Sequence, residues 1–166
     1  MAVLALGCGS TMFPAMILAA HDPEELNKGN TLFDWAGLRG RRSDYGGAEE
    51  LYRAAVAAFD AALILEPNLV EAYINKGLAL ANWAGLRSQL GDHFAAKEKY
   101  GAAVAAADSA LAFAPNSIEA HANKGIALSS WADLLTKMGE YADAEKKYGE
   151  AVAAFDLAAR GNSEFF

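Results

Sequence analysis

A repeat with a period of 48 residues constrains the fold of this chain more than any other feature of its sequence. The tripeptide Asn-Lys-Gly occurs three times at that spacing, and a tryptophan follows each copy. The copies are Asn27-Lys28-Gly29 with Trp35, Asn75-Lys76-Gly77 with Trp83, and Asn123-Lys124-Gly125 with Trp131. The same register holds for Tyr52, Tyr100 and Tyr148 and for Asp60, Asp108 and Asp156. A period of this length is typical of stacked repeats, in which each unit buries its apolar face against its neighbours.

Composition narrows the class of protein. The chain has 166 residues, of which 54% are hydrophobic, so it fits one domain with ample material for a core. Its formal charge of -7 argues against a nucleic-acid partner, because phosphate backbones are bound by clustered Lys and Arg. Cys8 is the only cysteine, which excludes an internal disulfide and a cysteine-based metal site.

Each unit reads as a pair of helices. In the second unit, apolar residues recur every three to four positions from Leu69 to Leu90, and the pattern resumes after Gly91-Asp92 until Pro115. The third unit has its turn at Gly139-Glu140, and the first has its turn at Ser43-Asp44. We therefore expect an all-α repeat domain over residues 23–162, with units at about 23–66, 67–114 and 115–160.

The unit resembles the tetratricopeptide repeat family over about residues 24–160. The family pattern of aromatic, Gly, large apolar, Ala, aromatic, Ala and Pro is matched in the second and third units. The second unit supplies Tyr73, Gly77, Leu80, Ala103, Ala107, Ala110 and Pro115, and the third supplies His121, Gly125, Leu128, Ala151, Phe155 and Ala158. Two positions depart from the pattern, since His121 and Ala107 stand where the family has aromatic residues. The resemblance implies a right-handed α-solenoid of three hairpins.

The unit is longer than the family's usual one of about 34 residues. Each helix looks longer by about one heptad, which is close to two helical turns and leaves the buried face where it was. We therefore expect long hairpins and a deep groove.

The resemblance places a peptide-binding groove along the first helix of each unit. The expected groove residues are Asn27, Asn30, Glu71, Asn75, Leu78, Asn82, Glu119, Asn123 and Ile126. Because an asparagine amide both donates and accepts, the row Asn27, Asn75 and Asn123 could bind an extended peptide backbone. The alternative is that these amides bond within their own repeats.

The family's carboxylate clamp, which binds the C-terminal tails of chaperones, is not reproduced. Its positions correspond to Leu26, Asn30, Asn75, Glu119 and Asn123, so the asparagines are kept and every basic residue is lost. Acidic residues near the groove favour a neutral to basic protein or peptide as the partner.

These features predict a noncatalytic adaptor or scaffold for protein–protein interaction. The alternative is a structural subunit of a complex or oligomer that uses its end faces and leaves the groove unused. No catalytic motif is present, and we expect no enzyme activity and no cofactor. His21, His93 and His121 lie in separate segments, so no metal site is expected.

Tryptophan and lysine recur once in each unit. Trp35, Trp83 and Trp131 share the register of the apolar stripe, so we expect them to pack between hairpins instead of serving as exposed recognition anchors. Lys28, Lys76 and Lys124 are expected to be solvated positions between repeats instead of a basic ladder for a ligand.

The ends of the chain leave two questions open. Residues 1–22 form an apolar segment, and Ala2 to Ala20 carries no charge, which reaches the length of a membrane-spanning helix. It is either a membrane anchor, the reading its lack of a polar face favours, or a helix that caps the stack. At the other end, Gly161-Asn162 predicts a helix stop before a tail at 163–166. The exposed face of the last unit would then need a second copy, a partner or the tail to cover it.

Overall fold

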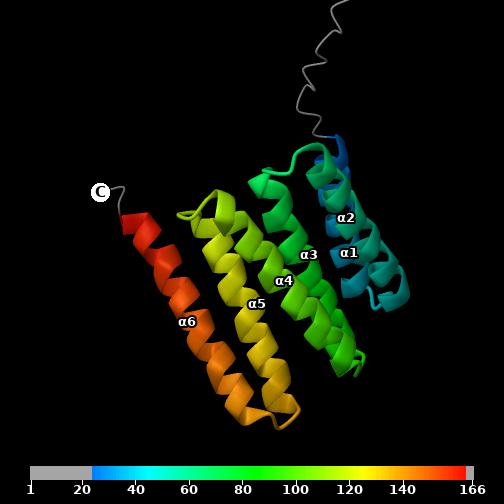
Figure 1. Cartoon of the computed structure of the whole chain (residues 1–166). Helices are drawn as coiled ribbons and strands as arrows, with labels where there is room; N and C mark the ends of the chain where they lie inside the picture. The colour runs from blue at the N-terminus through cyan, green and yellow to red at the C-terminus, as the bar shows by residue number, and fades with distance from the viewer. Residues whose placement is uncertain (1–23, 164–166) are drawn as a thin grey trace, which may run out of the picture.

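The computed structural model describes residues 24–163, which form six α-helices and, within that range, no strand. The helices are α1 (Glu24–Arg41), α2 (Tyr45–Leu65), α3 (Val70–Gln89), α4 (His93–Phe113), α5 (Ile118–Lys137) and α6 (Tyr141–Ser163). They form three hairpins, α1–α2, α3–α4 and α5–α6, which lie side by side (Figure 1). The predicted all-α class is confirmed.

The turn inside each hairpin uses one left-handed residue followed by an acidic one. Gly91 and Gly139 have φ angles of 81° and 79°, which glycine adopts without steric cost. Ser43 has a φ of 62° at the same place in the first hairpin, an uncommon value for a residue with a side chain. Asp44 and Asp92 then cap α2 and α4, each accepting a hydrogen bond of 3.1 Å from a backbone N–H three residues on.

Small residues set the distance between the two helices of each hairpin. Gly29 lies against the fully buried ring of Phe59, and Gly125 lies in the same way against Phe155. In the middle hairpin alanine replaces that aromatic residue, and a Cβ on Gly77 would lie 3.2 Å from the Ala103 carbonyl oxygen. In the middle hairpin the backbone of α4, instead of an aromatic ring, therefore lies against the glycine of the first helix.

The junctions between hairpins repeat as well. Lys76 of α3 pairs with Asp60 of α2 at 2.5 Å, and Lys124 of α5 pairs with Asp108 of α4 at 2.6 Å. Lys76 and Lys124 were predicted to be solvated, but each is partly covered because it forms an ion pair that links neighbouring hairpins. Exposed pairs of this kind stabilise a protein by about 0–1 kcal/mol each, so they serve register more than stability.

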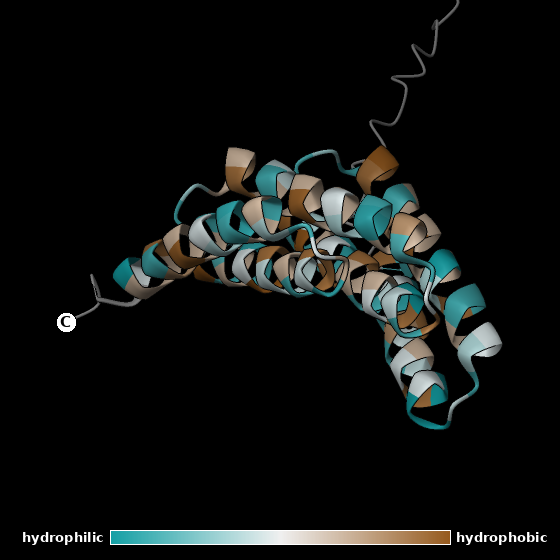
Figure 2. Ribbon diagram, turned by 90° about the horizontal axis from the view of Figure 1, so that it is seen from below, coloured by the Kyte–Doolittle hydropathy of each residue, from teal (hydrophilic) through white to brown (hydrophobic). Residues whose placement is uncertain are grey.

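The described hairpins stack into an arch (Figure 2). The first helices α1, α3 and α5 contact one another in turn, whereas α2, α4 and α6 do not. Because the first helices are more closely spaced, they line the inner side of the arch.

Two expectations need correction. Trp83 is buried and Trp131 is partly buried, but Trp35 is 47% exposed, because no helix precedes α1 among residues 24–163. The helix stop predicted at Gly161-Asn162 is wrong, since α6 runs to Ser163. A side chain at Gly161 would lie 2.8 Å from Ile118, so this glycine allows the last turn of α6 to approach the start of α5.

The predicted segment at residues 1–22 and the last residues of the tail lie outside the described part of the chain. Among residues 24–163, no helix combines the length and the apolar character that crossing a membrane requires.

Candidate functional site

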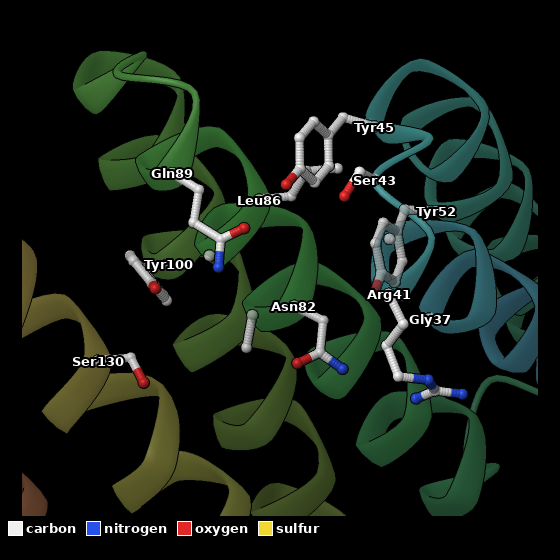
Figure 3. A pocket seen from close by; sticks show the side chains of 13 residues that line it. Gly37, Arg41, Ser43, Tyr45, Tyr52, Asn82, Leu86, Gln89, Tyr100 and Ser130 are labelled. Atoms are coloured by element: carbon white, nitrogen blue, oxygen red, sulfur yellow. The ribbon is translucent and has the colours of Figure 1, made fainter.

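A hollow of about 590 Å³ lies on the inner side of the arch, near the C-terminal ends of α1 and α3. Its walls come from α1, α3 and α5, and residues of α2 and α4 reach it from behind (Figure 3). Gly37, Gly85 and Ala81 are among its lining residues, and their small size keeps the space open.

Two tyrosines of the 48-residue register form the floor of the hollow. Tyr52 and Tyr100 are only 6% and 5% exposed, and both line the space. Burial raises the pKa of both phenols, and the charge of Asp133 raises the pKa of Tyr100 further, against a smaller opposite effect of a hydrogen bond with Ser130. Both rings therefore keep their hydroxyl protons at neutral pH and present neutral groups that can donate and accept.

Two amides of α3 stand at the edge of the hollow. Asn82 and Gln89 are seven residues apart, close to two turns, so they project from the same face of the helix. Both are exposed, and Figure 3 shows their amide groups directed toward the open space. Each offers two donors and one acceptor oxygen, a combination that suits the backbone of an extended peptide.

The remaining wall adds one cation, hydroxyls and an aromatic ring. Arg41 and Ser43 contribute from the end of the first helix and its turn, Tyr45 from the start of α2, and Ser130 from α5. A smaller hollow of about 190 Å³ shares Gln89 and Ser130 and continues to Asp133 and Lys137. Because charges of both signs line the two hollows, the site carries no strong net field and favours a neutral ligand over a highly charged one.

Most of the residues predicted from sequence lie elsewhere on the same helices. Of the nine, Asn82 lines the hollow. Glu71 and Glu119 lie in the first turns of α3 and α5, away from the hollow at the other ends of these helices. Asn27 and Ile126 are exposed, while Leu78 and Asn123 are partly buried.

One pair of the predicted asparagines is engaged inside the protein. The Asn75 amide donates a hydrogen bond of 2.9 Å to the Asn30 side-chain oxygen, which links α3 to α1. The contact crosses to the neighbouring hairpin, so it differs from the alternative in which the asparagines bond within their own repeats. It leaves these two amides with less capacity for a ligand.

Sequence reasoning missed the tyrosine floor and Gln89. Tyr52 and Tyr100 were visible as a repeated position in the sequence, but the repeat gave no sign that they border an open space. Gln89 has Arg41 and Lys137 at the equivalent positions of the other units, so no periodic signal marks it.

In the part of the chain that the structure describes, no group of three or more His, Cys, Asp or Glu side chains is arranged to hold a metal ion.

A scan against models of known protein families finds no match to this chain, and a search of curated proteins finds no significant relative.

Proposed function

We propose that this protein is a noncatalytic scaffold that binds an extended segment of a partner protein in the hollow on α1, α3 and α5. The observation that carries the proposal is the row of exposed amides, Asn82 and Gln89, above a floor of neutral tyrosines. Amides of this kind can pair with peptide N–H and C=O groups whatever the sequence of the peptide.

The shape of the site supports binding more than chemistry. The hollow is open, and its lining holds amides, hydroxyls, aromatic rings and one guanidinium. Tyr45 and Tyr52 offer aromatic surface for an apolar side chain, while the amides orient the backbone beside it. The resemblance to tetratricopeptide repeats, which bind peptides along their first helices, supports the same assignment.

Peptide selection on the full-length protein would test this function. A library of random linear peptides would be selected against the wild type, and the affinity of selected peptides measured by fluorescence anisotropy. The variant Asn82→Ala with Gln89→Ala should weaken binding about tenfold or more, because two hydrogen bonds contribute about 0.5–1.5 kcal/mol each.

The matched control removes two amides from the same set of helices outside the hollow. Asn27→Ala with Asn123→Ala should leave the affinity unchanged. Loss of binding in this control, with binding kept in the first variant, would move the site to the asparagine row and away from the hollow. A library that yields no peptide above background would overturn the proposal.

A second candidate function is that of a structural subunit that uses its end faces. It is favoured by the apolar exposure of α6, where Val152 and Leu157 are 59% and 47% exposed.

A further inference from the structure

The two ends of the described stack carry the two halves of one repeated junction. At the α2–α3 and α4–α5 junctions, the first helix of one hairpin packs on the second helix of the hairpin before it. The hairpins share one register, so the outer face of α1 corresponds to the packed faces of α3 and α5. The outer face of α6 likewise corresponds to the packed faces of α2 and α4. In Figure 1, α6 and the α1–α2 hairpin stand at opposite ends of the stack.

The repeated lysine–aspartate pair is split between these ends. Inside the chain it is formed twice, by Lys76 with Asp60 and by Lys124 with Asp108. The equivalent lysine of α1 is Lys28. Within residues 24–163, its only ion pair is with Glu25 of its own helix, at 3.1 Å. The equivalent aspartate of α6, Asp156, is exposed and forms no ion pair within the same range.

A second ion pair, formed at the α2–α3 junction but not at α4–α5, where Leu135 and Lys97 occupy its positions, also has its two halves at the ends. Arg87 of α3 pairs with Glu49 across the junction and lies 3.5 Å from Asp92 in its own hairpin. Arg39 is its equivalent in α1, and it keeps the partner within the hairpin, Asp44. The position of Glu49 on α6 is occupied by Glu145, which is exposed and unpaired among the described residues.

The tryptophan contact is split too. Trp131 of α5 lies 3.6 Å from the position of a Cβ on Gly101 of α4, and both residues have equivalents at the ends. Trp35 is 47% exposed on α1, and Gly149 of α6 has no atom within 4 Å of its Cβ position.

We infer that the outer face of α1 in one copy of this chain docks on the outer face of α6 in a second copy. The contact would combine features of the two inner junctions: Lys28 on Asp156 as at both, Arg39 on Glu145 as at α2–α3, and Trp35 over Gly149 as at α4–α5. Charge complementarity fixes the register, and the two apolar faces supply the buried surface. The contact is heterologous, so it builds a closed ring or an open superhelical array, depending on the rotation per copy. The inference does not depend on the groove.

A charge-swap experiment on the full-length protein tests this contact by analytical ultracentrifugation over a range of concentrations. The wild type should associate with increasing concentration. Lys28→Glu with Arg39→Glu should raise the dissociation constant about tenfold or more, because two attractive pairs become like-charge contacts. Glu145→Lys with Asp156→Lys should do the same. A chain carrying all four changes has both pairs restored in reverse and should associate like the wild type.

Glu71→Lys with Glu119→Lys is the matched control, since it changes two acidic residues of the middle and last hairpins outside the end faces. It should leave association unchanged, and circular dichroism would confirm that every variant is folded. A wild type that stays monomeric at all concentrations would overturn the inference. This holds also if the reason is that residues 1–23 or another protein cover α1. Association that ignores the charge changes, or that the four-fold variant fails to restore, would overturn it as well.

Discussion

At the scale of single residues, the tryptophan that recurs in each unit lies in three different environments. Trp83 is 9% exposed between two hairpins, whereas Trp35 is 47% exposed at the end of the described stack. The Lys99 ammonium lies 4.6 Å from the Trp83 ring centroid and Lys147 lies 4.6 Å from that of Trp131, but Arg39 lies 5.3 Å from that of Trp35. Identical positions in the sequence therefore differ in their contribution to stability according to the neighbour they meet.

This difference predicts unequal effects of the same substitution. Trp83→Ala should lower the free energy of unfolding by about 3–5 kcal/mol, since it opens a cavity in the core. Trp35→Ala should lower it by about 0.5 kcal/mol or less in the dilute monomer, since half of the side chain already faces water. Urea denaturation followed by circular dichroism measures both. Equal losses would show that Trp35 is covered, contrary to its exposure among residues 24–163.

At the scale of the helix pair, packing depends on where a glycine faces a side chain. A Cβ on Gly29 would lie 2.5 Å from the ring of Phe59, which is fully buried and cannot move away. A Cβ on Gly125 would meet Phe155 at 2.7 Å, but that ring is 40% exposed and has room to shift. Gly149 faces open space. Alanine would favour the helix over glycine at all three positions, but the space available to its Cβ differs from one position to the next.

Alanine at these glycines should therefore give three different results. Gly29→Ala should destabilise the protein by about 1–3 kcal/mol through overpacking. Gly149→Ala should stabilise the dilute monomer by about 0.5–1 kcal/mol, because alanine favours the helix and meets nothing. Gly125→Ala should fall between them. Thermal or urea unfolding provides the ranking, and a destabilised Gly149→Ala monomer would contradict the open space seen there.

Sequence reasoning succeeded for elements and failed where a residue has no periodic signal. Helix positions followed from the spacing of apolar residues and from the turn at Gly91-Asp92, which encode local geometry directly. The hollow did not follow, because Gln89 occurs once and reaches Ser130 only through the packing of α3 on α5. The end of α6 was missed for a related reason, since Gly161 serves a contact with Ile118 and not a helix stop.

At the scale of the whole molecule, stability is distributed along the stack. Each hairpin contacts only its neighbours, so the α3–α4 hairpin is supported on two sides and the α5–α6 hairpin on one, within the described range. In such an array, stability is close to a sum of unit terms and nearest-neighbour terms. The end units should open locally at lower free energy than the middle one.

Hydrogen exchange with mass spectrometry tests this distribution. At low concentration, amides of α3 and α4 should exchange most slowly and those of α6 most rapidly. At high concentration, protection should rise in α1 and α6 if copies join end to end. Uniform protection along the chain at low concentration would mean that the molecule opens as a single unit, contrary to the expectation for nearest-neighbour stacking.

The connections between hairpins are also copies of one another. Leu69 and Ser117 each donate a backbone hydrogen bond to the residue three positions earlier, at 3.1 Å and 3.0 Å. A sequence insertion of one whole unit would preserve this connection and the lysine–aspartate pair of each junction. One extra residue within a helix would instead turn its buried face by about 100°. The length of this protein can therefore change in evolution by duplication of whole hairpins far more easily than by smaller steps.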